Sequence, residues 1–242
     1  RSDGTINRTG KTSKLSFDFW AMRGMWALAS GYEVFRSLDP PYAVVLKKHF
    51  DTALKQLKET ISHSPHGLPN NATDQGSQAL LALCVFYQAL PRDDIKALIE
   101  QLADRIVSAQ GKNPGEFPFR SYPSIIPGDG KPPSLWHAWG SRQMMALALS
   151  GKLLRRPDWI RSAEREANHW TVHVLATRGN LHGMNPDPVL YPEQPYGMEV
   201  TVQGLVQLYR STKKDHWSGR FLVSWKQHGR QSDVRLPNRQ GL

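Results

Sequence analysis

A helical segment of small and apolar residues recurs four times along the 242-residue chain. Each copy is apolar almost all round, the pattern of a helix buried on every side. The copies span residues 20–28, 74–83, 139–147 and 197–208. They lie 55, 64 and 60 residues apart when they are aligned on Ala27, Ala82, Ala146 and Val206. A repeat of this length predicts one supersecondary unit per copy, stacked against its neighbours.

An amphipathic helix follows each buried copy after a short turn. These outer helices are expected over about 42–62, 93–110, 157–176 and from 215 onward. The unit is therefore a helical hairpin, and no stretch alternates for long enough to predict a strand. Hairpins wrapped side by side predict an all-α fold, an α/α toroid with about four hairpins. We expect one domain over 1–242, with 1–16 as a loop segment and 226–242 as an irregular C-terminal tail.

The loops between hairpins are long and the turns within hairpins are short. The long connections cover about 63–73, 111–133 and 178–195. In an up-and-down arrangement they all lie at one end, together with the N-termini of the inner helices. Long loops on a rigid scaffold commonly carry function, so we expect the site at that face.

The net charge, the cysteine content and the histidine spacing restrict which partners and metal ions we expect the protein to bind. The net charge is +10, but the basic residues are dispersed in singles and pairs. That dispersal favours a solvated surface, and we expect neither a nucleic-acid nor a membrane partner, although the charge suits an anionic glycan. The lone Cys84 excludes an intrachain disulfide and a Cys-rich zinc site. His169 and His173 have ligand spacing but no evident acidic third ligand, so no metal and no cofactor are expected.

Several segments carry a resemblance to a known family. They are residues 18–32, 74–76, 136–140 and 191–199. In these segments, and in pattern over most of 15–213, the sequence resembles the six-hairpin glycosidase superfamily, the (α/α)6 toroids. The resemblance implies a carbohydrate-active protein, most simply a glycoside hydrolase, and favours a secreted or extracytoplasmic location. The sequence contains about four hairpins, whereas the toroids of this superfamily have six. The C-terminal stretch from Trp225 does not look like a further inner helix, so we expect a partial toroid.

Glycoside hydrolysis uses two carboxyl groups flanking the scissile bond. The acids expected at the long-loop face are Asp18, Asp74, Glu116, Asp187, Glu193 and Glu199. We assign the catalytic pair to Asp74 and Glu199, each at the start of an inner helix. A helix N-cap for Asp74 and a dipole-favouring first-turn acid for Glu199 are the competing interpretations.

Aromatic, basic and polar groups at the same junctions are the expected sugar-binding residues, because aromatic faces cover the apolar side of a pyranose. They are Asp18, Arg120, Tyr122, Trp136, His137, Trp139 and Tyr196. Trp20 and Trp26 are assigned to the core.

Two other functions stay open at this point. The first is a polysaccharide lyase acting on a uronate glycan, with Arg120 neutralising the carboxylate and Tyr122 or His137 as the base. The second is a non-catalytic glycan-binding or truncated toroid protein.

Overall fold

The computed structural model describes residues 16–126, 136–138, 140–171, 183–185, 187–189 and 195–217, together with isolated positions before residue 16. The long helices are α1 (Phe19–Leu38), α2 (Pro40–Ser62), α3 (Thr73–Ala89), α4 (Asp93–Ser108), α5 (Gln143–Leu153), α6 (Pro157–Glu166) and α8 (Pro195–Thr212). Short elements are the 3-10 turn η2 (Pro69–Asn71), the π-helical turn η3 (Ala167–Thr171) and the strands β1 (Trp136–His137), β2 (Gly183–Asn185) and β3 (Asp187–Val189).

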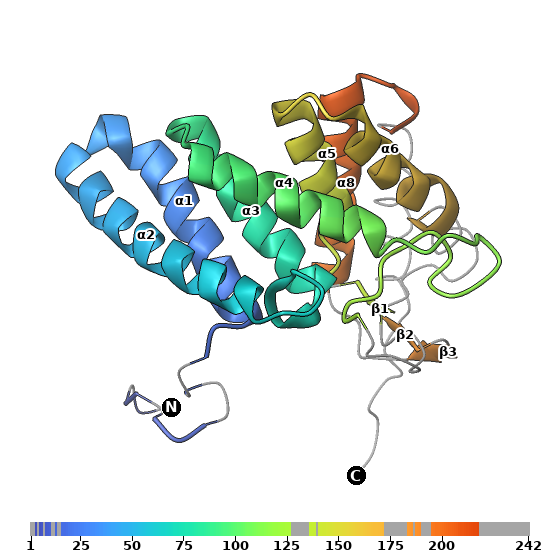
Figure 1. Cartoon of the computed structure of the whole chain (residues 1–242), viewed down its shortest axis with the longest axis horizontal. Helices are drawn as coiled ribbons and strands as arrows, with labels where there is room; N and C mark the ends of the chain where they lie inside the picture. The colour runs from blue at the N-terminus through green and yellow to red at the C-terminus, as the bar shows by residue number, and fades with distance from the viewer. Residues whose placement is uncertain are drawn as a thin grey trace, which may run out of the picture.

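Helices pair into antiparallel hairpins, as the repeat predicts. α1 packs on α2, α3 on α4 and α5 on α6, while α1, α3, α5 and α8 follow one another as the inner helices (Figure 1). Asp39 makes the first turn tight, because its backbone N–H closes α1 and its carboxylate accepts from Tyr42 N (3.0 Å) to open α2. The helical toroid prediction is confirmed. The tail 226–242 and most of the fourth outer helix lie outside the described residues.

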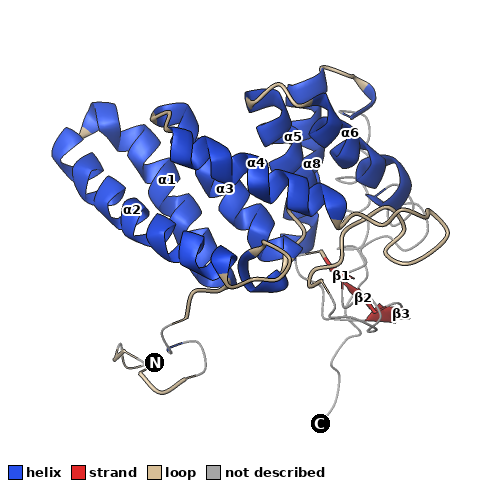
Figure 2. Cartoon of the chain, viewed as in Figure 1, coloured by secondary structure: helices blue, strands red, loops and turns tan. Residues whose placement is uncertain are grey.

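A three-stranded antiparallel sheet, in the order β1-β2-β3, was not predicted. Figure 2 shows it as the small red element below a molecule that is otherwise helical or loop. Each strand is two or three residues long, too short for an alternating pattern to be visible in the sequence. The sheet brings His137 to the loop end of the helices.

The main core lies around α3. Leu80, Leu81, Ala82, Leu83 and Cys84 have no exposed surface, as expected for an inner helix. This core draws buried residues from all four inner helices, including Met22, Met144 and Leu205. The four repeats thus share one hydrophobic interior.

The helix α1 is less buried than its sequence predicts. Trp20 is 65% exposed, and Val34 and Leu38 are also exposed. The reason is position, since α1 packs on α2 and α3 but has no described inner helix on its other side. The assignment of Trp20 to the core is wrong; Trp26 is half-buried and packs against the core.

The described parts of the long connections after α2 and α4, residues 63–72 and 109–126, lie at one end of the helices with the sheet, and the short turns lie at the other end (Figure 1). The connection after α4 is fastened to the start of α3. Thr73 N and Asp74 N donate to Ser124 O (3.0 and 3.5 Å), and Ile126 N donates to Asn71 O (2.8 Å). The loop end is therefore held by backbone hydrogen bonds between two loops that are distant in sequence.

Candidate functional site

Asp74 and His137 form a polar pair at the loop end of the inner helices. The Nε2 atom of His137 lies 3.2 Å from Oδ2 of Asp74. The Nδ1 atom of His137 accepts from Gly140 N at 3.0 Å, so the proton of the neutral ring belongs on Nε2, facing the carboxylate. Asp74 is 6% exposed, and its Oδ1 accepts from Gln75 N at 2.7 Å. The pair is thus a carboxylate held on both oxygens inside the protein.

Helix geometry explains the position of Asp74. The N-cap of α3 is Ala72, so Asp74 is a first-turn residue and not the cap. The partial positive charge of the helix N-terminus favours a carboxylate there.

Gly140 is needed for the pair to form. A Cβ atom at this position would lie 2.1 Å from His137 Cε1 and 3.2 Å from Asp74 Oδ2. No side chain fits in that space, so only glycine lets the backbone approach the imidazole closely enough to donate to it. The glycine lies in a segment that carried the family resemblance, but its sequence alone gives no sign of this role.

Glu199 lies in the first part of α8 and is bound by an arginine. Both of its carboxylate oxygens accept from Nη2 of Arg142 at 3.3 Å, and Oε1 also accepts from Gln203 Nε2 at 2.6 Å. Arg142 donates to Gln203 as well, and its side chain is 1% exposed against 41% for Glu199. These contacts hold both oxygens of the Glu199 carboxylate in place.

Two consecutive residues connect the predicted acids. Gln143 donates from Nε2 to Thr73 Oγ1 (2.9 Å), beside Asp74, while Arg142 binds Glu199. Sequence reasoning missed both Arg142 and Gln143. The available signal was a pair of long polar side chains at the entry of a helix that is otherwise apolar.

Tyr196 lies between two arginines. Its ring centroid is 4.9 Å from the guanidinium carbon of Arg23 and 5.7 Å from that of Arg142. The Arg142 guanidinium also lies 5.2 Å from the Trp26 ring. These cation–π contacts join α1, α5 and α8 at the same end as Glu199. The Tyr196 hydroxyl is buried and has no hydrogen-bond partner.

One further buried amide lies on α3. Gln78 is one helical turn beyond Asp74 and has no exposed surface. Its amide oxygen and nitrogen have no hydrogen-bond partner among the described residues. Unsatisfied buried amides are costly and are rare in native cores. Together with the Tyr196 hydroxyl, Gln78 is a group that a polar ligand or water could satisfy.

The remaining predicted residues make no contact with the Asp74 or His137 side chains that the described structure shows. Asp18 is the N-cap of α1, accepting from Trp20 N (3.1 Å) and Ser16 Oγ (2.6 Å). Trp136 is packed edge-on against Trp170, with ring centroids 4.8 Å apart. Trp139 and Glu193 lie outside the described residues.

Tyr122 and Arg120 belong to a buried network behind the loop. Tyr122 is fully buried and hydrogen-bonded to Ser162 Oγ at 2.7 Å, and burial raises its pKa well above the ordinary value. Arg120 accepts at its backbone oxygen from Gln110 (2.8 Å). A tyrosine in this setting keeps its proton, which does not suit a lyase base.

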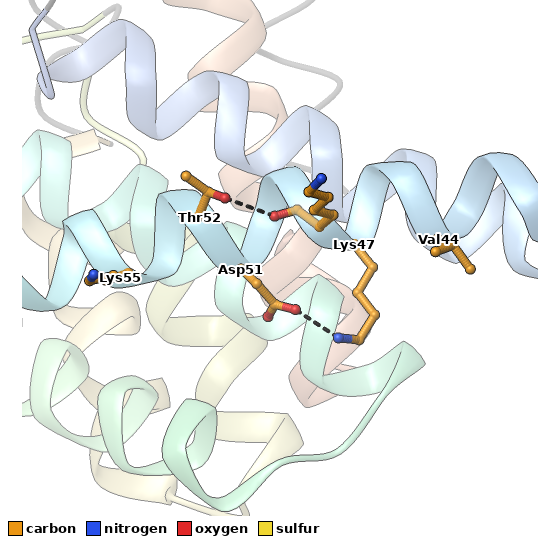
Figure 3. A pocket seen from close by; sticks show the side chains of 6 residues that line it. Val44, Lys47, Asp51, Thr52 and Lys55 are labelled. Carbon is orange, nitrogen blue, oxygen red and sulfur yellow. Dashed lines mark hydrogen bonds and ion pairs between the residues drawn. The ribbon is translucent and has the colours of Figure 1, made fainter.

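A shallow hollow on the opposite, outer side of the first hairpin is separate from these residues. Figure 3 shows it along α2, lined by Val44, Lys47, Lys48, Asp51, Thr52 and Lys55. Lys47 pairs with Asp51 at 2.7 Å, both partly exposed. The hollow is an open, solvated helix face.

In the described part of the chain, no group of three or more His, Cys, Asp or Glu side chains could hold a metal ion. None of the described helices is long and apolar enough to cross a membrane.

Neither a protein-family model nor a curated protein matches the sequence. Solved structures do match. The GH76 α-mannanase of Bacteroides thetaiotaomicron aligns with a TM-score of 0.69 at 9% identity, covering 91% of this chain and 63% of the mannanase. A D-mannose isomerase aligns with a TM-score of 0.60 at 13% identity, covering 86% of this chain and 60% of the isomerase.

An unsaturated glucuronyl hydrolase specific for heparin aligns with a TM-score of 0.60 at 15% identity, covering 85% of this chain and 54% of the hydrolase. The chain therefore spans between about half and two thirds of the length of these structures. These likenesses confirm the fold that the sequence predicts, an α/α toroid of helical hairpins.

Proposed function

We propose that the protein is carbohydrate-active and hydrolyses a glycosidic bond at the loop face of the inner helices. The observation that carries the proposal is a pair of carboxylates that each have a fixed partner: Asp74 faces His137, and Glu199 is bound by Arg142. Gln143, next to Arg142, donates to Thr73, the residue before Asp74. Two fixed carboxyl groups are what glycoside hydrolysis requires. The solved structures with this fold include a mannanase and a glucuronyl hydrolase, which supports a glycan as the substrate.

The contacts suggest a role for each group. The imidazole of His137 orients Asp74, because its Nδ1 accepts from Gly140 N and its Nε2 faces the carboxylate. We assign the proton transfer to Asp74, the carboxyl member of the pair. Glu199, positioned by Arg142 and Gln203, serves as general base or nucleophile. Tyr196 and Trp26 lie against the Arg142 guanidinium and so help to hold it beside Glu199.

Hydrolysis is preferred to lyase chemistry for a specific reason. Of the two bases that the lyase alternative names, Tyr122 is buried and bonded to Ser162. The other, His137, accepts from Gly140 N at Nδ1 and faces Asp74 with Nε2. Proton abstraction beside a uronate needs an ionisable base that reaches the substrate.

The test is turnover on a panel of neutral and uronate glycans, measured as reducing-sugar release and, separately, as ultraviolet absorbance of an unsaturated product. Asp74→Asn and Glu199→Gln should each reduce hydrolysis by about 10²–10⁴-fold, the usual contribution of acid–base groups. Asp93→Asn is the matched control for Asp74, because Asp93 is also a first-turn acid but is exposed on α4. Glu33→Gln, exposed on α1, serves for Glu199.

Each result has a distinct meaning. Unsaturated product without hydrolysis would establish a lyase instead. Saturable glycan binding without turnover would establish a non-catalytic binding protein. Full activity in both acid variants would disprove the assigned site.

A further inference from the structure

A buried acid outside the proposed site is tied to the loop that builds it. Glu166 ends the outer helix α6 and is 3% exposed. Its Oε1 accepts from Ser121 Oγ at 2.6 Å, while Oε2 is buried and has no hydrogen-bond partner in the part of the chain that the structure describes. Within the described residues no basic side chain forms an ion pair with it. An unpaired charge in such surroundings is costly, so the geometry favours the neutral acid.

The groups around Glu166 form one network that joins α4, the loop and α6. Gln110, after α4, donates to Arg120 O and Ser162 O, both at 2.8 Å. Its Oε1 accepts from Ser162 Oγ (2.8 Å) and Arg165 Nε (2.9 Å).

The ionisable neighbours of Glu166 are few. Arg165 precedes Glu166 on α6, and its guanidinium donates from Nε to Gln110. Tyr122 on the loop is the other titratable group, electrostatically coupled to Glu166 and hydrogen-bonded to Ser162. Glu164, on the same helix, pairs with Lys214 at the surface. None of these groups neutralises a charge on Glu166.

The loop held by Glu166 reaches the Asp74–His137 pair. Three residues after Ser121, Ser124 accepts at its backbone oxygen from Thr73 N and Asp74 N. Ser124 Oγ also accepts from His137 N at 3.3 Å. One short segment thus contacts the backbone of both members of the pair.

Burial raises the pKa of Glu166 to about 8, and the hydrogen bond from Ser121 opposes that rise. The carboxyl group therefore holds its proton at neutral pH and releases it under mildly alkaline conditions.

We propose that Glu166 is a positioning residue, a neutral buried acid that fixes residues 111–126 and, through Ser124, holds Asp74 and His137 in place, so that its ionisation loosens the site. The functional role of this site rests on the proposed function, whereas the coupling between Glu166 and the Asp74–His137 pair does not.

Amide hydrogen exchange tests the coupling without a substrate. If loop opening hydrates Glu166, ionisation favours the open form between the ordinary pKa of 4.5 and about 8. Protection of the Thr73, Asp74 and His137 amides should then fall by about tenfold per pH unit across this window, after correction for intrinsic exchange. In Glu166→Gln, which keeps the shape without the charge, protection should not depend on pH.

Two further variants separate the explanations. Glu164→Gln, which removes the surface pair with Lys214, should behave like the wild type. Ser121→Ala removes the bond to Glu166 and should lower protection of the same three amides already at pH 6. This variant keeps the test possible if Glu166→Gln folds poorly.

The proposal is overturned if Glu166→Gln keeps the pH dependence of the wild type. It is also overturned if only the loop amides respond while Thr73, Asp74 and His137 stay protected, because Glu166 would then be a local structural acid. These readouts stand apart from turnover: failure to find a glycan substrate leaves them intact, and their failure leaves the effect of Asp74→Asn on hydrolysis intact.

Discussion

The guanidinium of Arg142 donates to both carboxylate oxygens of Glu199 at 3.3 Å, although the arginine is buried and the glutamate is half exposed. Arg142 also donates to Gln203 and lies over Trp26 and Tyr196. The residue therefore fixes the proposed site by charge, by hydrogen bonding and by stacking.

Arg142→Met should destabilise the protein by about 1–2 kcal/mol, because Gln203 and Glu199 lose a donor while the exposure of Glu199 limits the cost. Arg142→Lys should restore little, since an ammonium lacks the planar fork and stacking face of a guanidinium. Urea unfolding measures both variants. An Arg142→Met protein as stable as the wild type would show that the ion pair is dispensable.

Gly140→Ala should displace His137 from Asp74, since the new Cβ would lie 2.1 Å from Cε1 of the ring. We expect loss of glycan turnover and a destabilisation of about 1–3 kcal/mol, typical of overpacking. The matched control is Gly24→Ala in α1, where a Cβ meets nothing within 4 Å. That control should gain about 0.5–1 kcal/mol from helix propensity. Equal thermal shifts in the two variants would contradict the steric argument.

Arg92 joins the first two outer helices by binding Asp51 on α2 and Asp94 on α4. The hydrogen bond from Arg92 lowers the pKa of Asp94 below its ordinary value. A depressed pKa contributes stability that is present above the unfolded value near 3.8 and is lost as the pH falls through the folded value.

Arg92→Met should cost about 0.5–1 kcal/mol at pH 7 and low salt, because the groups are partly exposed and screened. The difference from the wild type should shrink in high salt and below about pH 3. Denaturant titrations at two pH values and two salt concentrations measure it. A difference that persists unchanged in acid would mean that Arg92 acts through packing.

Cys84, the single cysteine of the chain, lies in the middle of α3 without exposed surface. Burial raises the pKa of its thiol, so the reactive thiolate is suppressed in the folded protein. We expect a thiol reagent to label it only as fast as the core opens, in step with urea unfolding followed by tryptophan fluorescence. Rapid labelling of the native protein would show that α3 opens locally.

The sequence was most informative where a pattern is local and repeated. The run from Leu80 to Cys84 predicts a helix buried on every side, and the structure confirms it. The same composition in α1 predicts the same burial, yet Trp20 is exposed, because burial depends on which neighbour covers a helix and periodicity does not report that.

The candidate site shows the same contrast between what a local sequence pattern predicts and what tertiary packing decides. Asp74 lies at the start of an inner helix, directly after a long connection. Because long and short connections alternate, the sequence predicts that Asp74 lies at the end of the molecule where the long loops gather. The contact between Asp74 and His137 depends on the two-residue strand β1, which carries His137, and on Gly140, which leaves room for the imidazole. Neither feature has a pattern that can be recognised in the sequence. Tyr122 has the residue type of a base, but its burial among Ser162 and Gln110 comes from tertiary packing.

The adjacency of Arg142 and Gln143 has a mechanical consequence. Gln143 donates to Thr73 at the start of α3, and Arg142 binds Glu199 near the start of α8. Two consecutive residues at the entry of α5 thus contact the segments that carry Asp74 and Glu199. A displacement of this one helix entry therefore disturbs the supports of both acids together.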